Sequence, residues 1–176
     1  MKKKQKINTI AIHVFKLEMT YGHMKWKVSQ LARISHVSRA LIYFYFGKTK
    51  KEIFQHAFKL VCDDIYCVSI EKQQQIKDGQ IVKAILHTRH LINKNYFLQV
   101  FTHRWRNSKT EIEKWLIEYE ILAEKKLQTQ FPQYSKKQIK LVHISLQGLL
   151  TAPFIDDSNV KEMIALLFEN SKYVKL

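Results

Sequence analysis

Glycine and proline are scarce in this chain of 176 residues, which contains four Gly and two Pro. A protein of many strands needs these residues in its turns, so their scarcity argues against a β-rich fold. Apolar residues nevertheless make up 46% of the chain, which is enough to build a packed core over this length. The composition therefore predicts an all-α fold with few connections.

Cysteine and long apolar runs are scarce as well. Cys62 and Cys67 are five positions apart on one expected helix, a spacing that suits neither a disulfide nor a metal site. We interpret both as small buried residues in a reducing cytoplasm. No window is apolar for long enough to span a membrane, and the basic start MKKKQK leads into a broken apolar run without a cleavage site. We therefore expect a cytoplasmic protein that has no membrane partner.

Acidic residues are few: Asp and Glu number 15 against 30 Lys and Arg, which gives a net charge of +15. The excess is concentrated in residues 1–60, which hold 13 basic but only 2 acidic side chains. Such a segment suits a polyanion, because each phosphate that it neutralises releases a condensed counterion. Composition alone leaves open a nucleic-acid surface, a merely solvated surface and a segment that binds anionic lipid.

Catalytic motifs are missing too. The sequence contains no nucleophile elbow, no phosphate-cradling Gly loop and no paired carboxylates, so we expect no enzymatic activity, no catalytic residue and no cofactor. His87 and His90 stand three apart, with His103 further along, but no Cys or carboxylate supports them at a ligand spacing. We therefore predict no metal site, although a metal-dependent helical enzyme remains an alternative.

Apolar residues recur at helical spacing along most of the chain. Beyond the segment discussed next, helices are expected at 4–21, from residue 50 to about 68, and at 80–92, 96–106, 109–131, 136–152 and 159–173. Ser108 with Glu111, and Ser135 with Gln138, have the form of capping boxes. The polar segment 71–79 is the best candidate boundary between the two parts. We call residues 1–60 the head and residues 61–176 the body.

Residues 28–46 predict a helix-turn-helix. Val28, Leu31 and Ser35 share one helical face, and Ser38 is a good N-cap for a second helix. The short turn between the helices, Ser35-His36-Val37, forces them to cross steeply, which is how a recognition helix is presented to the major groove. This corner predicts binding to double-stranded DNA.

The aromatic run Ile42-Tyr43-Phe44-Tyr45-Phe46 has strong β-propensity in isolation. A single strand has no partner in a helical chain, so we expect a helix in which Ile42 and Phe46 face the core. Tyr43 and Tyr45 are then expected to donate hydroxyl groups to DNA phosphates. A plain core-packing role for both tyrosines is the alternative.

The head resembles the TetR family of bacterial transcriptional regulators. The resemblance covers about residues 7–61 and depends on Leu31, Ala32, Val37, Ser38, Arg39, Ile42, Tyr43, Phe46, Gly47, Lys50 and Ile53. It implies a cytoplasmic homodimer whose variable helical body binds a small-molecule effector and shifts the two heads. His36 stands where the family usually has Gly, Trp26-Lys27 replaces a Thr pair, and one extra residue precedes Lys50.

We predict that Arg39 reads a guanine through a bidentate contact and that Ala40 allows close approach or touches a thymine methyl group. The other contacts should position the head on the phosphates, although a solvated role is open for each lysine. The predicted DNA-binding residues are Lys25, Trp26, Lys27, Ser38, Arg39, Ala40, Tyr43, Tyr45, Lys48 and Lys50.

Aromatic and polar residues of the body are expected to line its core, part of which is a candidate effector pocket formed by His90, Phe97, Phe101, Trp105, Trp115 and Tyr119. The last two helices are apolar nearly all round, so each needs neighbours on more than one side. Residues 139–150 carry two stripes, of which Leu141, Ile144 and Gly148 form the second. We predict a four-helix dimer interface formed by Val142, Leu146, Leu149, Leu150, Ile164, Leu167 and Phe168, with burial in the same chain as the alternative.

These patterns predict a homodimeric, ligand-responsive, sequence-specific DNA-binding regulator, most simply a repressor that binds a palindromic operator. The alternative of a different class is a basic helical protein that binds nucleic acid or anionic membrane without sequence preference.

Overall fold

The structure is a computed structural model that describes residues 3–153 and 155–168. Helices α1 to α10 span, in order, Lys3–Tyr21, Val28–Ser35, Arg39–Phe46, Lys50–Ile65, Ile70–Lys77, Ile81–Lys94, Phe97–Trp105, Glu111–Gln130, Lys136–Thr151 and Asp157–Leu167. No strand occurs within these two ranges, so the predicted all-α class is confirmed. The end of the last expected helix, beyond residue 168, lies outside the described residues.

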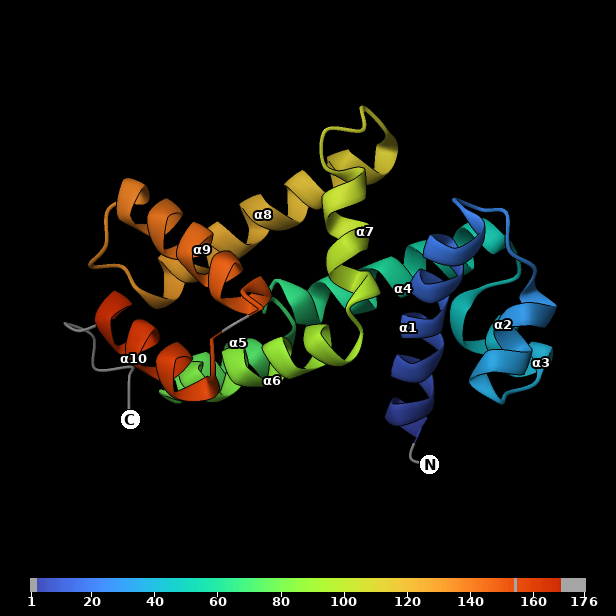
Figure 1. The fold of residues 1–176 in the computed structure, drawn as a ribbon, viewed down its shortest axis with the longest axis horizontal. Coiled ribbons are helices and arrows are strands. Elements are labelled where there is room, and N and C mark those ends of the chain that lie inside the picture. The colour runs from blue at the N-terminus through green and yellow to red at the C-terminus, as the bar shows by residue number, and fades with distance from the viewer. Residues whose placement is uncertain (1–2, 154, 169–176) are drawn as a thin grey trace.

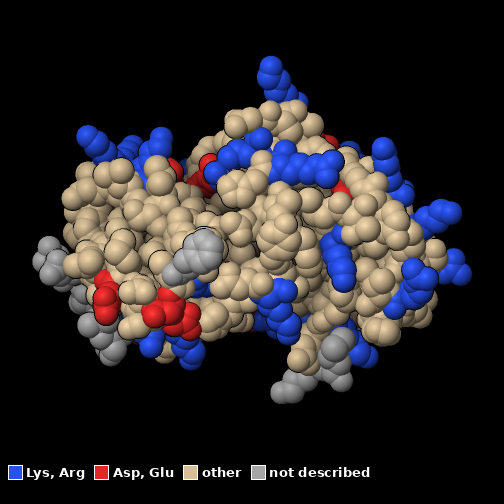
Figure 2. All heavy atoms as spheres, viewed as in Figure 1, with Lys and Arg blue, Asp and Glu red and all other residues tan. Residues whose placement is uncertain are grey.

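Helix α4 joins two groups of helices (Figure 1). On one side α1, α2 and α3 surround its N-terminal half, and on the other α5–α10 form the body. Figure 2 shows Lys and Arg side chains projecting over α1–α3, while acidic side chains gather at the opposite end over α10. None of the helices in the described part of the chain is long and apolar enough to cross a membrane.

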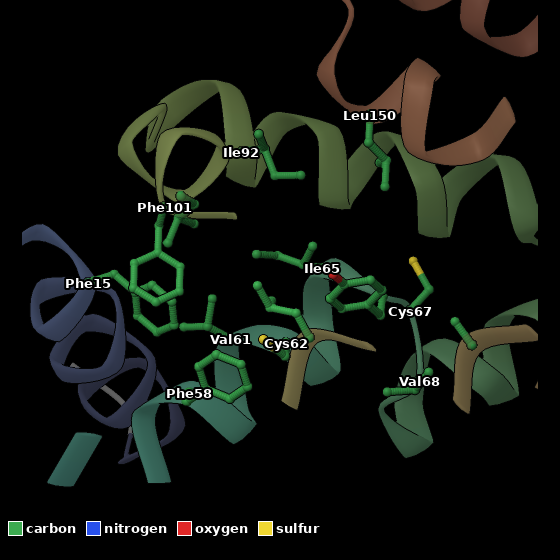
Figure 3. Close-up of a cluster of buried hydrophobic side chains, with 14 of the residues drawn as sticks. Phe15, Phe58, Val61, Cys62, Ile65, Cys67, Val68, Ile92, Phe101 and Leu150 are labelled. Carbon is green, nitrogen blue, oxygen red and sulfur yellow. The ribbon is translucent and has the colours of Figure 1, made fainter. Parts of the chain in front are cut away.

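The core runs without a break from the head into the body. Phe15 of α1 meets Phe58 of α4 and Phe101 of α7, with ring centroids 6.2 and 4.6 Å away, and the same apolar cluster continues to Ile92 and Leu150 (Figure 3). The predicted boundary at 71–79 is wrong, because most of this segment is helix α5, packed on α6 and α8. Its polar sequence reflects one solvent-exposed side rather than a linker.

Side-chain caps define several helix ends. At α4, the Glu52 carboxylate accepts hydrogen bonds from the backbone amides of Lys48 (2.7 Å) and Thr49 (3.0 Å), which lower its pKa. The predicted capping box of Ser135 and Gln138 is confirmed at α9. The one predicted at Ser108 is wrong, because α8 begins only at Glu111 and has no side-chain cap at its N-cap residue.

Arg89 of α6 holds the end of α9, although its residue is only 3% exposed. Its guanidinium donates hydrogen bonds to the carbonyl oxygens of Leu149 (2.5 Å), Ala152 (2.9 Å) and Ile155 (2.6 Å). Pro153 has no amide hydrogen to offer the Leu149 carbonyl, so the helix cannot satisfy this group by continuing. A buried cation therefore replaces the missing backbone donors at the negative end of α9.

Both cysteines are buried, as the sequence predicted, and each is a free thiol. Burial raises the pKa of the Cys62 and Cys67 thiols, which keeps them protonated and weakly reactive. They therefore act as small core residues.

Candidate nucleic-acid interface

Helices α2 and α3 meet at a tight corner. His36 adopts the left-handed conformation, with φ 53° and ψ 41°, and the next amide, of Val37, donates to the Ala32 carbonyl at 3.1 Å. The Ser38 hydroxyl accepts a hydrogen bond from the Leu41 amide at 3.2 Å. His36 thus occupies the position where Gly is favoured, and Ser38 is the predicted N-cap of the second helix.

Helix α3 includes the whole aromatic run, so the helical prediction for residues 42–46 is confirmed. Ile42 and Phe46 are buried, as expected for two residues four apart on the inner face. The outer face carries Arg39, Ala40 and Tyr43, all exposed. Their side chains are therefore free to meet a ligand that approaches this helix.

Tyr45 lies on another side of α3. It is half-buried against the apolar core, and the Lys3 ammonium lies 5.6 Å from the centre of its ring. Residues two apart on a helix point about 200° apart, because each residue turns the helix by about 100°. The prediction that Tyr43 and Tyr45 face the same partner is therefore wrong for Tyr45, which packs beside α1.

Phe44 is the residue of this face that the sequence interpretation missed. Its side chain is 77% exposed, although Phe is usually a core residue. It follows Tyr43 directly and stands four positions after Ala40, so it shares the outer face with both. The signal was present in the helical spacing, because fixing Ile42 and Phe46 inward places residue 44 outward.

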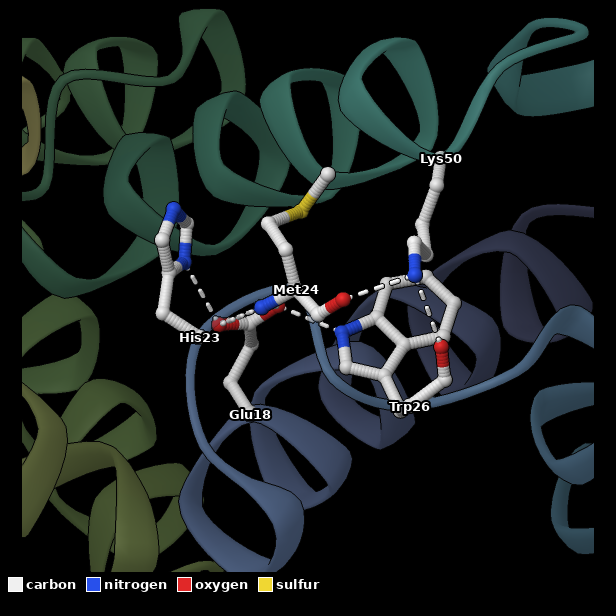
Figure 4. Close-up of polar contacts among 5 residues, drawn as sticks. All are labelled: Glu18, His23, Met24, Trp26 and Lys50. Atoms are coloured by element: carbon white, nitrogen blue, oxygen red, sulfur yellow. Dashed lines mark hydrogen bonds and ion pairs between the residues drawn. The ribbon is translucent and has the colours of Figure 1, made fainter.

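The segment between α1 and α2 is organised around a buried carboxylate (Figure 4). Glu18 is 2% exposed and accepts hydrogen bonds from His23 Nδ1 (2.8 Å), the Met24 amide (3.2 Å) and Trp26 Nε1. The Trp26 side chain is fully buried. The prediction that its indole contacts phosphate is therefore wrong, because Glu18 already accepts its only side-chain hydrogen bond.

The Lys50 side chain also forms its hydrogen bonds inside the head. Its ammonium donates to the carbonyl oxygens of Met24 (2.7 Å) and Trp26 (3.1 Å) and lies 5.9 Å from the Trp26 ring centre. The prediction that Lys50 contacts phosphate is thus wrong for this arrangement. Lys48, which is also among the predicted phosphate contacts, is exposed. Lys25 and Lys27 are exposed as well.

The head is positive because its 13 basic side chains outnumber its 2 acidic ones, and both carboxylates form hydrogen bonds within the head. Glu18 is buried, and Glu52 binds backbone amides at the start of α4. The exposed cations near the corner are Lys25, Lys27, Arg33, Arg39, Lys48 and Lys51. Lys51 lies 4.0 Å from a carboxylate oxygen of Glu111, while the other five form no ion pair with a residue in the described part of the chain. These cations give this end of the molecule the character of an anion-binding surface.

The predicted effector pocket is instead a packed aromatic cluster. Phe101 is completely buried, and Trp115 lies 5.3 Å from Phe58 between ring centres. Phe97, Trp105 and Tyr119 are half-buried and also pack against the core. His90 lies away from this cluster, on the surface, where its Nε2 is 2.9 Å from an Asp157 oxygen. The expected core role of these aromatic residues is therefore confirmed, and their rings pack together where the candidate pocket was expected.

The predicted dimer interface is also wrong. Val142, Leu146, Leu149, Leu150, Ile164 and Phe168 are buried within their own chain, and Leu167 is half-buried. They face α6, α8 and one another, because α9 packs between α6 and α8 and α10 covers α6 and α9. The exposed stripe of α9 is the second one, formed by Leu141, Ile144 and Gly148.

The histidines of α6 have partners other than a metal. His87 Nδ1 lies 3.1 Å from the buried ammonium of Lys72, and burial lowers the pKa of both groups. Within residues 3–153 and 155–168, no group of three or more His, Cys, Asp or Glu side chains is arranged to hold a metal ion.

Comparison of the chain with models of known protein families, with characterised proteins and with solved structures finds no match. The interpretation of the interface therefore depends on its geometry and charge.

Proposed function

We propose that this protein is a sequence-specific DNA-binding transcriptional regulator of the TetR type, in which α2 and α3 form a helix-turn-helix. The observation that carries the proposal is the outer face of α3, where Arg39, Ala40, Tyr43 and Phe44 are all exposed on a positive head. A short helix held by a tight corner, with uncovered side chains, is suited to the major groove.

The four residues differ in what they are able to recognise. Arg39 presents two donors to the O6 and N7 acceptors of guanine, while Ala40 and Phe44 suit the methyl group of thymine. Tyr43 has a hydroxyl for a phosphate at the edge of the groove, and Lys25, Lys27 and Lys48 supply charge for the backbone. Trp26 and Lys50 support this surface from inside and make no contact with DNA.

The protein acts as a cytoplasmic homodimer, most simply as an effector-responsive repressor on a palindromic operator. A dimer surface is available where α8 exposes Ile117 and Ile121 and α9 exposes Leu141, each between 47% and 56% exposed. Apolar patches of this kind mark association sites. Because α4 joins head and body, a movement of the body helices is transmitted to the spacing of the two recognition helices.

Selection of bound sites from random DNA, together with a molar-mass measurement in solution, tests this function. A palindromic consensus bound by a dimer is the expected result. A basic protein without sequence preference would instead enrich no site, and its binding would depend steeply on salt. That outcome, or an asymmetric site bound by a monomer, contradicts the proposal.

Arg39→Ala is expected to weaken binding to the selected operator by about 1–3 kcal/mol, with little change on random DNA, because it removes a base contact. Lys27→Ala is the contrasting variant, because loss of a phosphate contact should weaken binding to the operator and to random DNA to the same extent. Fluorescence anisotropy with the two DNAs at one salt concentration measures the difference. Equal losses for Arg39→Ala on both DNAs would show that Arg39 does not read a base.

Leu141→Glu combined with Ile121→Glu is expected to convert the dimer to a monomer, because four carboxylates would then lie in one symmetric apolar interface. Leu166→Glu on α10 is the control, since Leu166 is also exposed but lies on another helix. Analytical ultracentrifugation measures the molar mass of each. A double variant that remains dimeric would show that the interface lies on another surface.

A further inference from the structure

A groove between α7, α8 and α9 has the composition of a ligand site. Its volume is about 390 Å³, and its walls include Arg106, Glu120, Glu124, Lys140, His143 and Gln147. This volume lies within the range of small-molecule sites, about 300–1,000 Å³. The groove does not coincide with the aromatic set from which the sequence predicted an effector pocket.

His143 is the polar residue at the base of this groove. It is 6% exposed, and its ring lies 6.5 Å from that of Tyr66 in a nearly parallel arrangement of 13°. Neither ring nitrogen forms a hydrogen bond with any residue in the described part of the chain. Burial lowers the pKa of His143, so the ring is neutral near pH 7 and offers one donor and one acceptor. The ring nitrogens are not among the fully buried polar atoms that lack a partner, and His143 lines the groove, so both nitrogens remain accessible for hydrogen bonds with a ligand.

The charges of the groove are of both signs. Arg106 and Glu120 form an ion pair that joins α7 to α8. Glu124 of α8 and Lys140 of α9 line the same groove, and neither forms an ion pair with another residue among those that the structure describes. One free carboxylate and one free ammonium on opposing helices complement a ligand that carries both charges.

We propose that this groove binds a zwitterionic amino acid. The ligand's ammonium group meets Glu124, its carboxylate meets Lys140, and its side chain forms hydrogen bonds with His143 and Gln147. Its role as the effector depends on the proposed regulatory function, whereas the binding itself does not.

The groove has a direct connection to the head. Trp105, next to Arg106 at the end of α7, packs edge-on against His23 with ring centres 5.3 Å apart. His23 in turn binds Glu18, which fixes the segment before α2. A ligand that draws Arg106 or α7 toward the groove therefore acts on the segment that carries Lys25 and Lys27.

Isothermal titration calorimetry on the full chain without DNA tests the site, using each of the twenty amino acids as the probe at up to about 10 mM. At least one is expected to bind, and its N-acetyl and α-amide derivatives should bind about tenfold more weakly, since each lacks one charge. Absence of binding by all twenty, or equal binding by the blocked derivatives, overturns the proposal.

Three variants assign the contacts. Glu124→Gln and Lys140→Gln should each lower the affinity about tenfold. Glu124→Gln should then discriminate less between the amino acid and its N-acetyl derivative, and Lys140→Gln less between the amino acid and its α-amide. His143→Phe keeps a ring against Tyr66 and should also lose about tenfold. Thr129→Ala, an exposed change on α8 away from the groove, is the control. NMR signals of the His143 ring should shift on binding, and unchanged signals or unchanged affinities count against these contacts.

Operator binding is then measured with and without the amino acid that binds best. Release of operator supports the effector role. Binding of the amino acid without any change in operator affinity would support the binding site but contradict the effector role. Failure of the site selection on random DNA affects the proposed function alone, because the calorimetry contains no DNA.

Discussion

Replacing Glu18 by leucine is expected to lower the free energy of unfolding by about 3–5 kcal/mol. Leucine is an apolar side chain of similar size, and the change leaves His23 Nδ1, the Met24 amide and Trp26 Nε1 without their acceptor. Each buried donor that loses its partner costs about 1–3 kcal/mol. Glu18→Gln should have a smaller effect, because the amide retains one acceptor oxygen.

Urea unfolding followed by circular dichroism measures this loss. Glu118→Gln is the matched control, because Glu118 is an exposed glutamate on α8. The folded fraction of Glu18→Gln should also bind operator more weakly, since the segment before α2 loses its anchor. Stability within about 0.5 kcal/mol of the unchanged protein, the usual range for surface changes, would mean that Glu18 does not organise this segment.

Replacing Arg89 by methionine is expected to lower the free energy of unfolding by about 3 kcal/mol, because three carbonyl oxygens at the end of α9 and in the connection to α10 lose their donor. Methionine fills much of the same volume, so the loss reports the hydrogen bonds rather than a cavity. Arg89→Lys should recover only part of it, since an ammonium group cannot reproduce the planar fork of a guanidinium.

The measurement is again urea unfolding, with Lys94→Met as the control on the exposed side of the same helix. Hydrogen exchange adds a local test, because the amides of the last turn of α9 should lose protection first. If Arg89→Met unfolds at the same urea concentration as Lys94→Met, the guanidinium has no structural role.

Local rules account for the parts of the structure that the sequence predicted well. The Ser38 cap, the left-handed turn at His36 and the inward side chains of Ile42 and Phe46 each depend on neighbours a few positions away. Helical spacing was therefore sufficient to place them, even against the β-propensity of the aromatic run. The same spacing implies an outward Phe44, which the sequence interpretation missed because Phe is usually a core residue.

Contacts between distant helices account for the errors. Trp26 and Lys50 were predicted to contact phosphate because nothing in the local sequence shows their partners. Trp26 Nε1 donates to Glu18, and the Lys50 ammonium donates to the Met24 carbonyl. Two apolar stripes were recognised in residues 139–150, but only the position of α6 decides which of them is buried. The aromatic residues of the body were grouped correctly, yet whether such a group encloses a pocket or fills it depends on helix spacing.

Head and body share one continuous core, which couples their unfolding. Phe15 belongs to the head and Phe101 to the body, and both lie in one aromatic cluster with Phe58. A fragment that ends at residue 60 would lack Phe101, expose Phe15 and Phe58 to water and lose much of the burial that stabilises α1. Head and body should therefore unfold in a single cooperative transition, so that any signal between them travels through a tightly packed joint rather than a hinge.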